Sequence, residues 1–436
     1  MTAYEAVKVR LDPTPRQGRM LMSHAGAARF AFNKGLAHVK DALDKGEEPE
    51  WSYYALRKWW NANKATLAVN PETGEQWWQE NSKEAYNSGL ESLADGLRNF
   101  SKSRKGQRKG PRMGFPRFKS KNSSTLRFAY TTGIFGLIDG DPHALKFPRI
   151  GRIHCMENVY KKVDDAKVLR MTVSCHAGCW WASLTIERVD DSAPNPPKGG
   201  NIGVDLGIKE FATLSDGTVI HNPHALKSNI KRLKKAQRNL SRKQKDSNRR
   251  RKAKLHVSRL YARVANLRMD FLNKTTPMLA RTYTGISIED LNVAGMIKNH
   301  SLAQSIADAS FYEFRHQLTY KTARTGATLH VIDRWYPSSK TCSRCGAVKA
   351  KLPLSERVYH CDKCGLVIDR DLNAAININV AGSAPETLNA RGGDARHDRH
   401  APAAQTPVKR EPSGRANAVR LGADLGNEVM QVSDKQ

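Results

Sequence analysis

The sequence lacks any apolar run that approaches the ~20 residues a membrane-spanning helix needs. Its first five residues, Met1 to Glu5, also lack the basic-then-apolar pattern of a secretory signal peptide. These absences argue against a membrane protein and lead us to expect a cytoplasmic one. The length of 436 residues exceeds one ordinary core and predicts several modules.

Acidic residues are scarce relative to basic ones, with 42 Asp and Glu against 72 Lys and Arg, a formal net charge of +30. A solubilising surface does not need such an excess, because interspersed charges of both signs serve that purpose. A strongly positive chain attracts polyanions, and nucleic acid is the commonest such partner. The composition therefore predicts a nucleic-acid-binding protein.

Cysteine is also scarce, and four of the seven residues form one pattern of two C-x2-C pairs separated by fifteen residues: Cys342, Cys345, Cys361 and Cys364. Each pair is followed by a glycine, Gly346 or Gly365. Four thiolates close a tetrahedral zinc site and leave no open position, so the pattern predicts structural zinc. A thioredoxin-like redox pair would explain only one C-x2-C. The other cysteines lie in apolar, strand-like sequence and are expected in the core: Cys155, Cys175 and Cys179.

The first half of the chain changes its periodicity twice. Residues 4–10 alternate like a strand, residues 16–100 have helical spacing, and residues 125–190 contain several short strand patterns. We expect an antiparallel barrel or sandwich, into which the first strand could pair so that the helices are an insertion. Five tryptophans in the helical part are expected to be core anchors, with base stacking as the alternative for one of them: Trp51, Trp59, Trp60, Trp77 and Trp78.

Two segments concentrate the basic charge. Residues 101–121 contain nine Lys or Arg and no acid, with interleaved Phe115 and Phe118, and their glycines and prolines predict a non-helical phosphate-binding segment rather than a mere solvated loop. Residues 227–268 contain seventeen basic residues and one acid, Asp246. Apolar positions on both sides of Asp246 keep helical spacing, which predicts a hairpin of two basic helices.

The composition also predicts boundaries. Residues 190–200 are rich in Pro, Gly, Asp and Ser and indicate a linker. Residues after about 382 have no periodicity, and we expect a disordered tail.

Two acids end apolar strand patterns in the second half of the chain. Asp205 ends the run Ile202-Gly-Val-Asp, and Glu289 ends the run Ile286-Ser-Ile-Glu. An acid in an apolar strand is costly unless it is paired or binds a metal. Asp290 adjoins Glu289, but side chains alternate across a strand, so only one of the two can face the same site as Asp205.

A third acid follows the last cysteine. Asp371 stands in the first turn of a predicted helix, and Asp369 is an alternative that could be either a ligand or the helix cap. Three acids from two strands and a helix can bind two Mg²⁺ or Mn²⁺ ions about 4 Å apart, the arrangement used to hydrolyse phosphodiesters. The residues thus predict a metal-dependent nuclease with catalytic and magnesium-binding Asp205, Glu289 and Asp371.

These motifs, in this order, resemble the TnpB proteins of bacterial insertion sequences, relatives of the type V CRISPR nucleases. The resemblance rests on four segments: Gly203-Val-Asp-Leu-Gly-Ile-Lys, Ile288-Glu-Asp-Leu-Asn, Tyr336-Pro-Ser-Ser-Lys-Thr-Cys-Ser-Arg-Cys-Gly and Asp371-Leu-Asn-Ala-Ala-Ile-Asn-Ile. It covers residues 200–380 and extends toward the N-terminus through residues 27–35, but not to the tail. Position by position, it assigns the three acids to catalysis and the four cysteines to zinc.

The resemblance implies a multidomain α+β fold and the following allocation. A wedge-like β-barrel would comprise residues 1–12 and 112–195, and a helical recognition module residues 13–111. An RNase-H-like RuvC nuclease domain would comprise 196–337 and 367–382, split by a zinc ribbon at 338–366, with the tail at 383–436.

The implied activity is guide-RNA-directed cleavage of double-stranded DNA in a bacterial cytoplasm, associated with transposition. Two other functions remain open: a non-catalytic RNA- and DNA-binding repressor, and a RuvC-type transposase or resolvase that acts without a guide. The intact set of acids disfavours the repressor. A compact CRISPR effector would have a nearly identical sequence.

Overall fold

The computed structural model describes residues 2–121, 123–189, 196–353 and 355–383. The chain divides into two compact units at the predicted linker. Residues 190–195 of that linker and all but the first residue of the predicted tail lie outside the described residues. No helix within the described ranges is long and apolar enough to span a bilayer.

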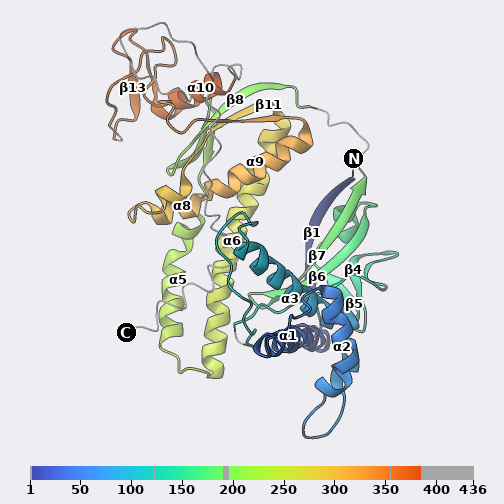
Figure 1. Cartoon of the computed structure of the whole chain (residues 1–436). Coiled ribbons are helices and arrows are strands. Elements are labelled where there is room, and N and C mark those ends of the chain that lie inside the picture. Colours follow the sequence, from blue (N-terminus) through green and yellow to red (C-terminus); the bar gives the residue numbers. More distant parts are fainter. Residues whose placement is uncertain (1, 122, 190–195, 354, 384–436) are drawn as a thin grey trace, which may run out of the picture. The chain divides into compact units, whose positions relative to one another are not determined.

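The first unit contains a seven-stranded antiparallel sheet with the order β2-β6-β7-β1-β5-β4-β3 (Figure 1). Strand β1 pairs with β7 from Thr2 opposite Val189 to Leu11 opposite Trp180, and it also pairs with β5. The helices that follow β1 are therefore inserted between two strands of one sheet. The strands are β1 (Thr2–Asp12), β2 (Arg127–Tyr130), β3 (Gly136–Ile138), β4 (Asp141–Phe147), β5 (Gly151–Cys155), β6 (Lys167–His176) and β7 (Cys179–Val189).

The sequence predicts a barrel or sandwich here, and the structure has one sheet whose two ends approach each other, since Tyr130 of β2 packs against Phe147 of β4 with ring centres 6.2 Å apart. Strands β2 and β3 end the sheet and are not paired with each other among the described residues. Both are short, and the pairing of β3 with β4 shifts register between Leu137 and Ile138. Short and irregular edges of this kind limit further pairing.

The inserted helices share one hydrophobic core with the sheet. Leu21, Leu36 and Leu90 of the helices belong to the same buried cluster as Phe128 and Leu184 of the strands. All five tryptophans of the insertion are in this cluster or pack against it, as predicted. The helical elements of this unit are α1 (Pro15–Asp44), α2 (Tyr53–Leu67), a 3-10 turn (Trp77–Glu80), α3 (Lys83–Arg104) and the short α4 (Val159–Val163).

The basic segment 101–121 is only partly as predicted, because α3 continues to Arg104 before the chain leaves the helix. Phe115 packs against the core, whereas Phe118 is exposed. Asn33 anchors the segment, since its amide donates to the Lys119 carbonyl and its side-chain oxygen accepts from the Lys119 NH. Most of the segment is thus non-helical and held against α1.

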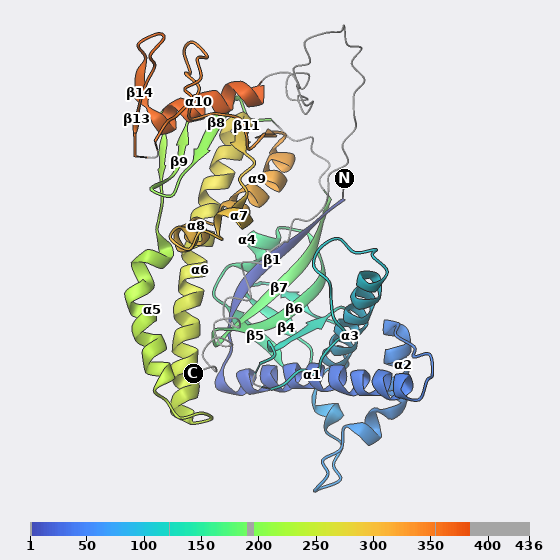
Figure 2. The same cartoon turned by 60° about the vertical axis from the view of Figure 1, so that its left-hand side comes forward.

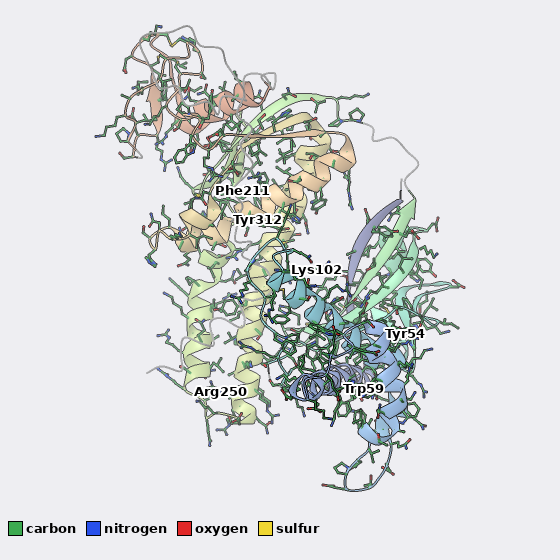
Figure 3. The ribbon with its side chains drawn as sticks, viewed as in Figure 1. Tyr54, Trp59, Lys102, Phe211, Arg250 and Tyr312 are labelled. Carbon is green, nitrogen blue, oxygen red and sulfur yellow. The ribbon has the colours of Figure 1, made fainter. Side chains whose placement is uncertain are left out.

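The second unit contains a five-stranded sheet with the order β10-β9-β8-β11-β12. Strands β8, β9 and β10 are joined as antiparallel neighbours, whereas β8, β11 and β12 are parallel. Phe211, labelled in Figure 3, and Phe314 lie fully buried where helices cover this sheet. The strands are β8 (Gly199–Leu206), β9 (Glu210–Leu214), β10 (Val219–His221), β11 (Tyr283–Glu289), β12 (Thr328–Ile332) and the separate pair β13 (Val358–His360) and β14 (Val367–Asp369).

The predicted basic hairpin of helices is present as α5 and α6, which project side by side from this unit (Figure 2). Leu233 and Ala236 of α5 pack on Val257 of α6. Of the seventeen basic residues, fourteen are exposed, while Lys243, Arg250 and Arg268 are half-buried. The helices of this unit are α5 (Ala225–Ser241), α6 (Asn248–Thr282), α7 (Val293–Met296), α8 (Ala303–Ala309), α9 (Phe311–Thr325) and α10 (Arg370–Ser383).

Candidate carboxylate site and cysteine cluster

The parallel strands β8 and β11 bring the first two predicted acids to the same level. Val204 and Ile288 are register partners, and Asp205 and Glu289 each follow one residue later. Parallel neighbours end at the same edge of a sheet, so the two acids lie at one edge.

Glu289 and its neighbour Asp290 have different partners. Glu289 accepts a hydrogen bond from the Ser338 hydroxyl, whereas Asp290 forms ion pairs with Arg315 and Arg334. Partial burial acts to raise the pKa of Asp290, but hydrogen bonds from the two arginines outweigh it and the net shift is downward. Asp290 is therefore neutralised by its own cations, which leaves Glu289 as the acid available at the site.

The third acid lies at the start of α10, where Asp369 and Asp371 take different roles. The Asp369 carboxylate accepts from the NH groups of Asp371 and Leu372 at 2.9 and 3.0 Å, which is the geometry of a helix N-cap. Asp371 is half-buried in the first turn, and its nearest cation is Arg357 at 3.8 Å. The cap occupies one oxygen of the Asp369 carboxylate, which favours Asp371 as the candidate third acid.

Asp205 is the electrostatic centre of this group. Burial, followed by the charges of Glu289 and Asp371, raises the pKa of Asp205 from 3.8 to about 8, although nearby Arg370 acts in the opposite direction. Burial also raises the pKa of Glu289, against the hydrogen bond from Ser338. Asp205 thus lies within electrostatic reach of both other predicted acids.

The approach of α10 to β8 depends on Gly203, two residues before Asp205. A Cβ atom at Gly203 would lie 2.0 Å from the Ala375 carbonyl oxygen of α10. Any larger residue would force α10 away from β8, beside which it lies in Figure 2, so this glycine permits the contact that brings Asp371 toward Asp205.

The four predicted zinc ligands do form one cluster. Their sulfur atoms all lie within 4.8 Å of one another, and the pairs Cys342–Cys364 and Cys345–Cys361 are 3.6 Å apart. Four sulfurs at about 2.3 Å from a tetrahedral zinc would be about 3.8 Å apart, so the spacing fits this ion. Among the described residues the three carboxylates do not form so tight a group.

The two halves of the cluster have the same backbone geometry. The NH of Gly346 bonds to the Cys342 carbonyl at 3.0 Å, and the NH of Gly365 bonds to the Cys361 carbonyl at 2.9 Å. Both glycines have positive φ, 72° and 67°, which a residue with a side chain rarely adopts. The glycine after each C-x2-C is therefore required by the turn.

Two buried asparagines join this cluster to α10. Asn373 accepts from the Ser343 NH at 2.9 Å and donates to the Thr341 carbonyl at 2.8 Å, and Asn377 donates to the same carbonyl and to that of Ser338. Sequence reasoning did not assign these asparagines a role, although two Asn four residues apart on one apolar helix face were a visible signal. They connect the cysteine cluster to the helix that carries Asp371.

The basic hairpin has its own anchor in Asp308, which is 7% exposed. Its carboxylate accepts from the NH groups of Leu226 and Lys227 in the first turn of α5, and it pairs with Arg268 of α6 at 3.0 Å. Helix α5 has no side-chain cap of its own, so Asp308 supplies one from α8. Sequence reasoning missed this residue because the partners are about 40 and 80 positions away.

Comparison with known proteins identifies the family. A protein of Streptomyces pristinaespiralis named "Putative RNA-guided DNA endonuclease" is 36% identical over 413 residues, which cover 93% of this chain and 96% of that protein. The chain belongs to the TnpB/IS605 OrfB family. Two further relatives are "Putative RNA-guided DNA endonuclease Rv2885c" of Mycobacterium tuberculosis, at 35% identity over 86% of this chain and 85% of that protein, and "InsQ" of Escherichia coli, at 30% over 88% and 94%.

Three family profiles match parts of this TnpB-family chain. One described as "Probable transposase" matches residues 183–300, and one described as "Cas12f1-like, TNB domain" matches residues 311–378, which include the cysteine cluster. A third, described as "Helix-turn-helix domain", matches residues 1–48, which here form one strand and one long helix. A solved complex of Cas12f1 with guide RNA and target DNA aligns over 87% of this chain and 99% of that one, with 13% identity and a TM-score of 0.43.

Proposed function

We propose that the protein is an RNA-guided DNA endonuclease associated with a transposable element. The names of its relatives support the guided activity, and the convergence of Asp205, Glu289 and Asp371 supports the chemistry. Their assignment as catalytic and metal-binding residues is part of this proposal.

The electrostatics of the acids suit divalent cations. Buried like charges are unfavourable together, as the raised pKa of Asp205 reflects, and a cation between them would remove that cost. Carboxylate oxygens are the ligands that Mg²⁺ and Mn²⁺ prefer. Two such ions would activate water and stabilise the leaving oxygen of a phosphodiester. Ser338 would hold Glu289 in place, and Arg315 and Arg334 would keep Asp290 out of the site.

The topology of the second unit supports an RNase-H-like RuvC assignment. An antiparallel three-stranded meander continued by two parallel strands, with acids on the first and fourth strands and on the last helix, is the arrangement that this assignment requires. We assign the nuclease domain to residues 196–337 and 367–382 and a zinc ribbon to 338–366, with the ribbon bonded to α10 through Asn373 and Asn377. In the first unit, we retain the wedge and recognition assignments of residues 1–12 with 112–195 and of residues 13–111.

The basic hairpin is proposed to contact nucleic-acid backbone. Its exposed lysines and arginines face solvent along both helices, and Arg250, labelled near its tip in Figure 3, braces the turn by donating to the carbonyl oxygens of Leu240 and Lys243. Contacts of this type depend on charge and shape rather than sequence, which suits a heteroduplex whose pairing carries the specificity.

The test is to purify the protein from cells that carry its native locus, sequence the bound RNA and assay cleavage of matching DNA with Mg²⁺. We expect one discrete RNA and metal-dependent cleavage, and Asp205→Ala should abolish cutting while RNA binding persists. Cleavage without a discrete RNA would favour the guide-free transposase or resolvase. RNA and DNA binding without cleavage would favour the repressor.

A further inference from the structure

A pocket of about 480 Å³ in the first unit is lined by none of the carboxylate-site residues, and its volume is in the range of small-ligand sites. Helix α2, the 3-10 turn, the first turn of α3 and the turn between β4 and β5 contribute its walls. Its lining combines aromatic, polar and cationic side chains, among them Trp60, Lys64, Trp78, Asn81, Tyr86 and Arg149.

Two buried polar atoms in this lining have no partner. The side-chain carbonyl oxygen of Asn81 and the hydroxyl of Tyr86 make no hydrogen bond within the described structure, although these residues are only 4% and 2% exposed. Asn81 and Tyr86 are neighbours, and because buried polar groups are nearly always fully paired, both could also bond to a ligand. The edges of nucleobases present a donor next to an acceptor and would satisfy both.

The two tryptophans of the pocket differ in their burial. Trp60 stacks on Tyr86, with ring centres 5.1 Å apart, and it is fully packed in the core. Trp78 is half-buried, its ring nitrogen donates to Gln76 at 3.1 Å, and the Lys64 amine lies 4.4 Å from the ring centre. The polar edge of Trp78 is thus satisfied, and a base could stack on the ring if it displaced the Lys64 amine.

Arg149 has an unfavourable backbone conformation. It is exposed in the turn between β4 and β5 with φ of +69°, a conformation that favours glycine over any residue with a side chain. Non-glycine residues held in this conformation are enriched at ligand sites. Arg149 and Lys64 together provide positive charge at the pocket for one phosphate.

We propose that this pocket binds one unpaired nucleotide of RNA or single-stranded DNA. The base would stack on Trp78 and bond to Asn81 and Tyr86, and its phosphate would bind Lys64 and Arg149. The alternative of base stacking by one tryptophan of the insertion is thereby assigned to Trp78. The proposal does not depend on the carboxylate site, and its test involves no cleavage.

Calorimetric titration of the full-length, metal-free protein tests this directly. The probes are AMP, CMP, GMP and UMP, their 2′-deoxy counterparts, and ribose 5-phosphate as the phosphate without a base, at about 0.3 M salt to suppress weak charge contacts. We expect at least one nucleotide to bind about tenfold or more tightly than ribose 5-phosphate, and a preference between ribo and deoxy forms would identify RNA or DNA as the source. Equal affinity for ribose 5-phosphate and all nucleotides would overturn the proposal.

Two variants separate a binding role from a structural one. Tyr86→Phe removes an unpaired buried hydroxyl, and Arg149→Gly relieves a positive φ, so neither should lower Tm, whereas each should weaken nucleotide binding by about five- to tenfold. Tyr54→Phe, at an exposed tyrosine of α2, and Ala177→Gly, at the positive φ of the β6–β7 turn, are the matched controls and should leave binding unchanged. Unchanged binding in both pocket variants, or a lower Tm for Tyr86→Phe, would contradict the proposal.

Discussion

At the end of β11, Glu289 accepts a hydrogen bond from Ser338, while the adjacent Asp290 pairs with Arg315 and Arg334. Alternation along the strand sends the two carboxylates to opposite environments. This divergence distinguishes a candidate catalytic acid from a structural one and leads to the first prediction.

Glu289→Gln should lower DNA cleavage by roughly a thousandfold, because a metal ligand contributes several kcal/mol to transition-state stabilisation. Asp290→Asn should retain most cleavage but lower the free energy of unfolding by about 1 kcal/mol, because it leaves two arginines without a carboxylate. Cleavage rates and thermal unfolding of both variants test whether Glu289 and Asp290 have these different roles. Equal loss of cleavage in the two would refute the distinction.

Asp369 and Asp371 at the start of α10 can be distinguished in the same way. Asp369→Asn should leave cleavage nearly unchanged, since asparagine caps a helix as well as aspartate does. Asp371→Asn should abolish cleavage with little effect on Tm. If instead the Asp369 variant is inactive and the Asp371 variant cuts normally, Asp369 is the third acid.

The raised pKa of Asp205 predicts how stability depends on pH in the protein without Mg²⁺. The folded protein keeps a proton that the unfolded chain releases above pH 3.8, so stability should fall as pH rises from there to about 8. Asp205→Asn should remove this loss, and its advantage over wild type should grow by at most about 1.4 kcal/mol per pH unit across the window. Thermal unfolding of the zinc-loaded protein without added Mg²⁺ at several pH values measures it. A stability difference between Asp205→Asn and wild type that does not change with pH in this range would contradict the shift.

The cysteine cluster should hold one zinc ion per chain, measurable by elemental analysis. Cys361→Ser should lose the ion and most cleavage, because the ribbon is bonded to the helix that carries Asp371. Asn373→Ala should keep the zinc but still reduce cleavage, since it removes two of those bonds. Full cleavage by zinc-free protein would show that the ribbon does not support the site.

Asp308 should be essential for the basic hairpin. Asp308→Ala leaves buried Arg268 and the first turn of α5 without their acceptor and should destabilise the protein by about 3–5 kcal/mol. Asp270→Ala breaks an exposed Lys274 pair on the same helix and should cost under about 0.5 kcal/mol. RNA binding, measured where both variants remain folded, should weaken only for Asp308→Ala.

Much of the fold could be predicted from local sequence patterns. The strand at residues 4–10, the basic hairpin about Asp246 and the spacing of the cysteines were readable because alternation, helical period and ligand spacing are properties of short segments. The structure corrected one local expectation, since α3 extends to Arg104, and it showed that the strands of the first unit form one sheet where the sequence had left barrel and sandwich open. Neither could be read locally, because edge pairing and helix length depend on neighbours distant in sequence.

The sequence by itself determined the candidate acids, the zinc ligands, the cationic surfaces and the family resemblance. Tertiary structure decided the partners of these neighbouring acids, since Asp290 meets its arginines and Asp369 caps α10 only once the chain is folded. It also brought Asp205 within reach of the charges of Glu289 and Asp371, although 166 positions separate Asp205 from Asp371. The sequence states where a carboxylate side chain stands in the chain. Its partners, and therefore its protonation state, depend on the groups that the fold packs around it.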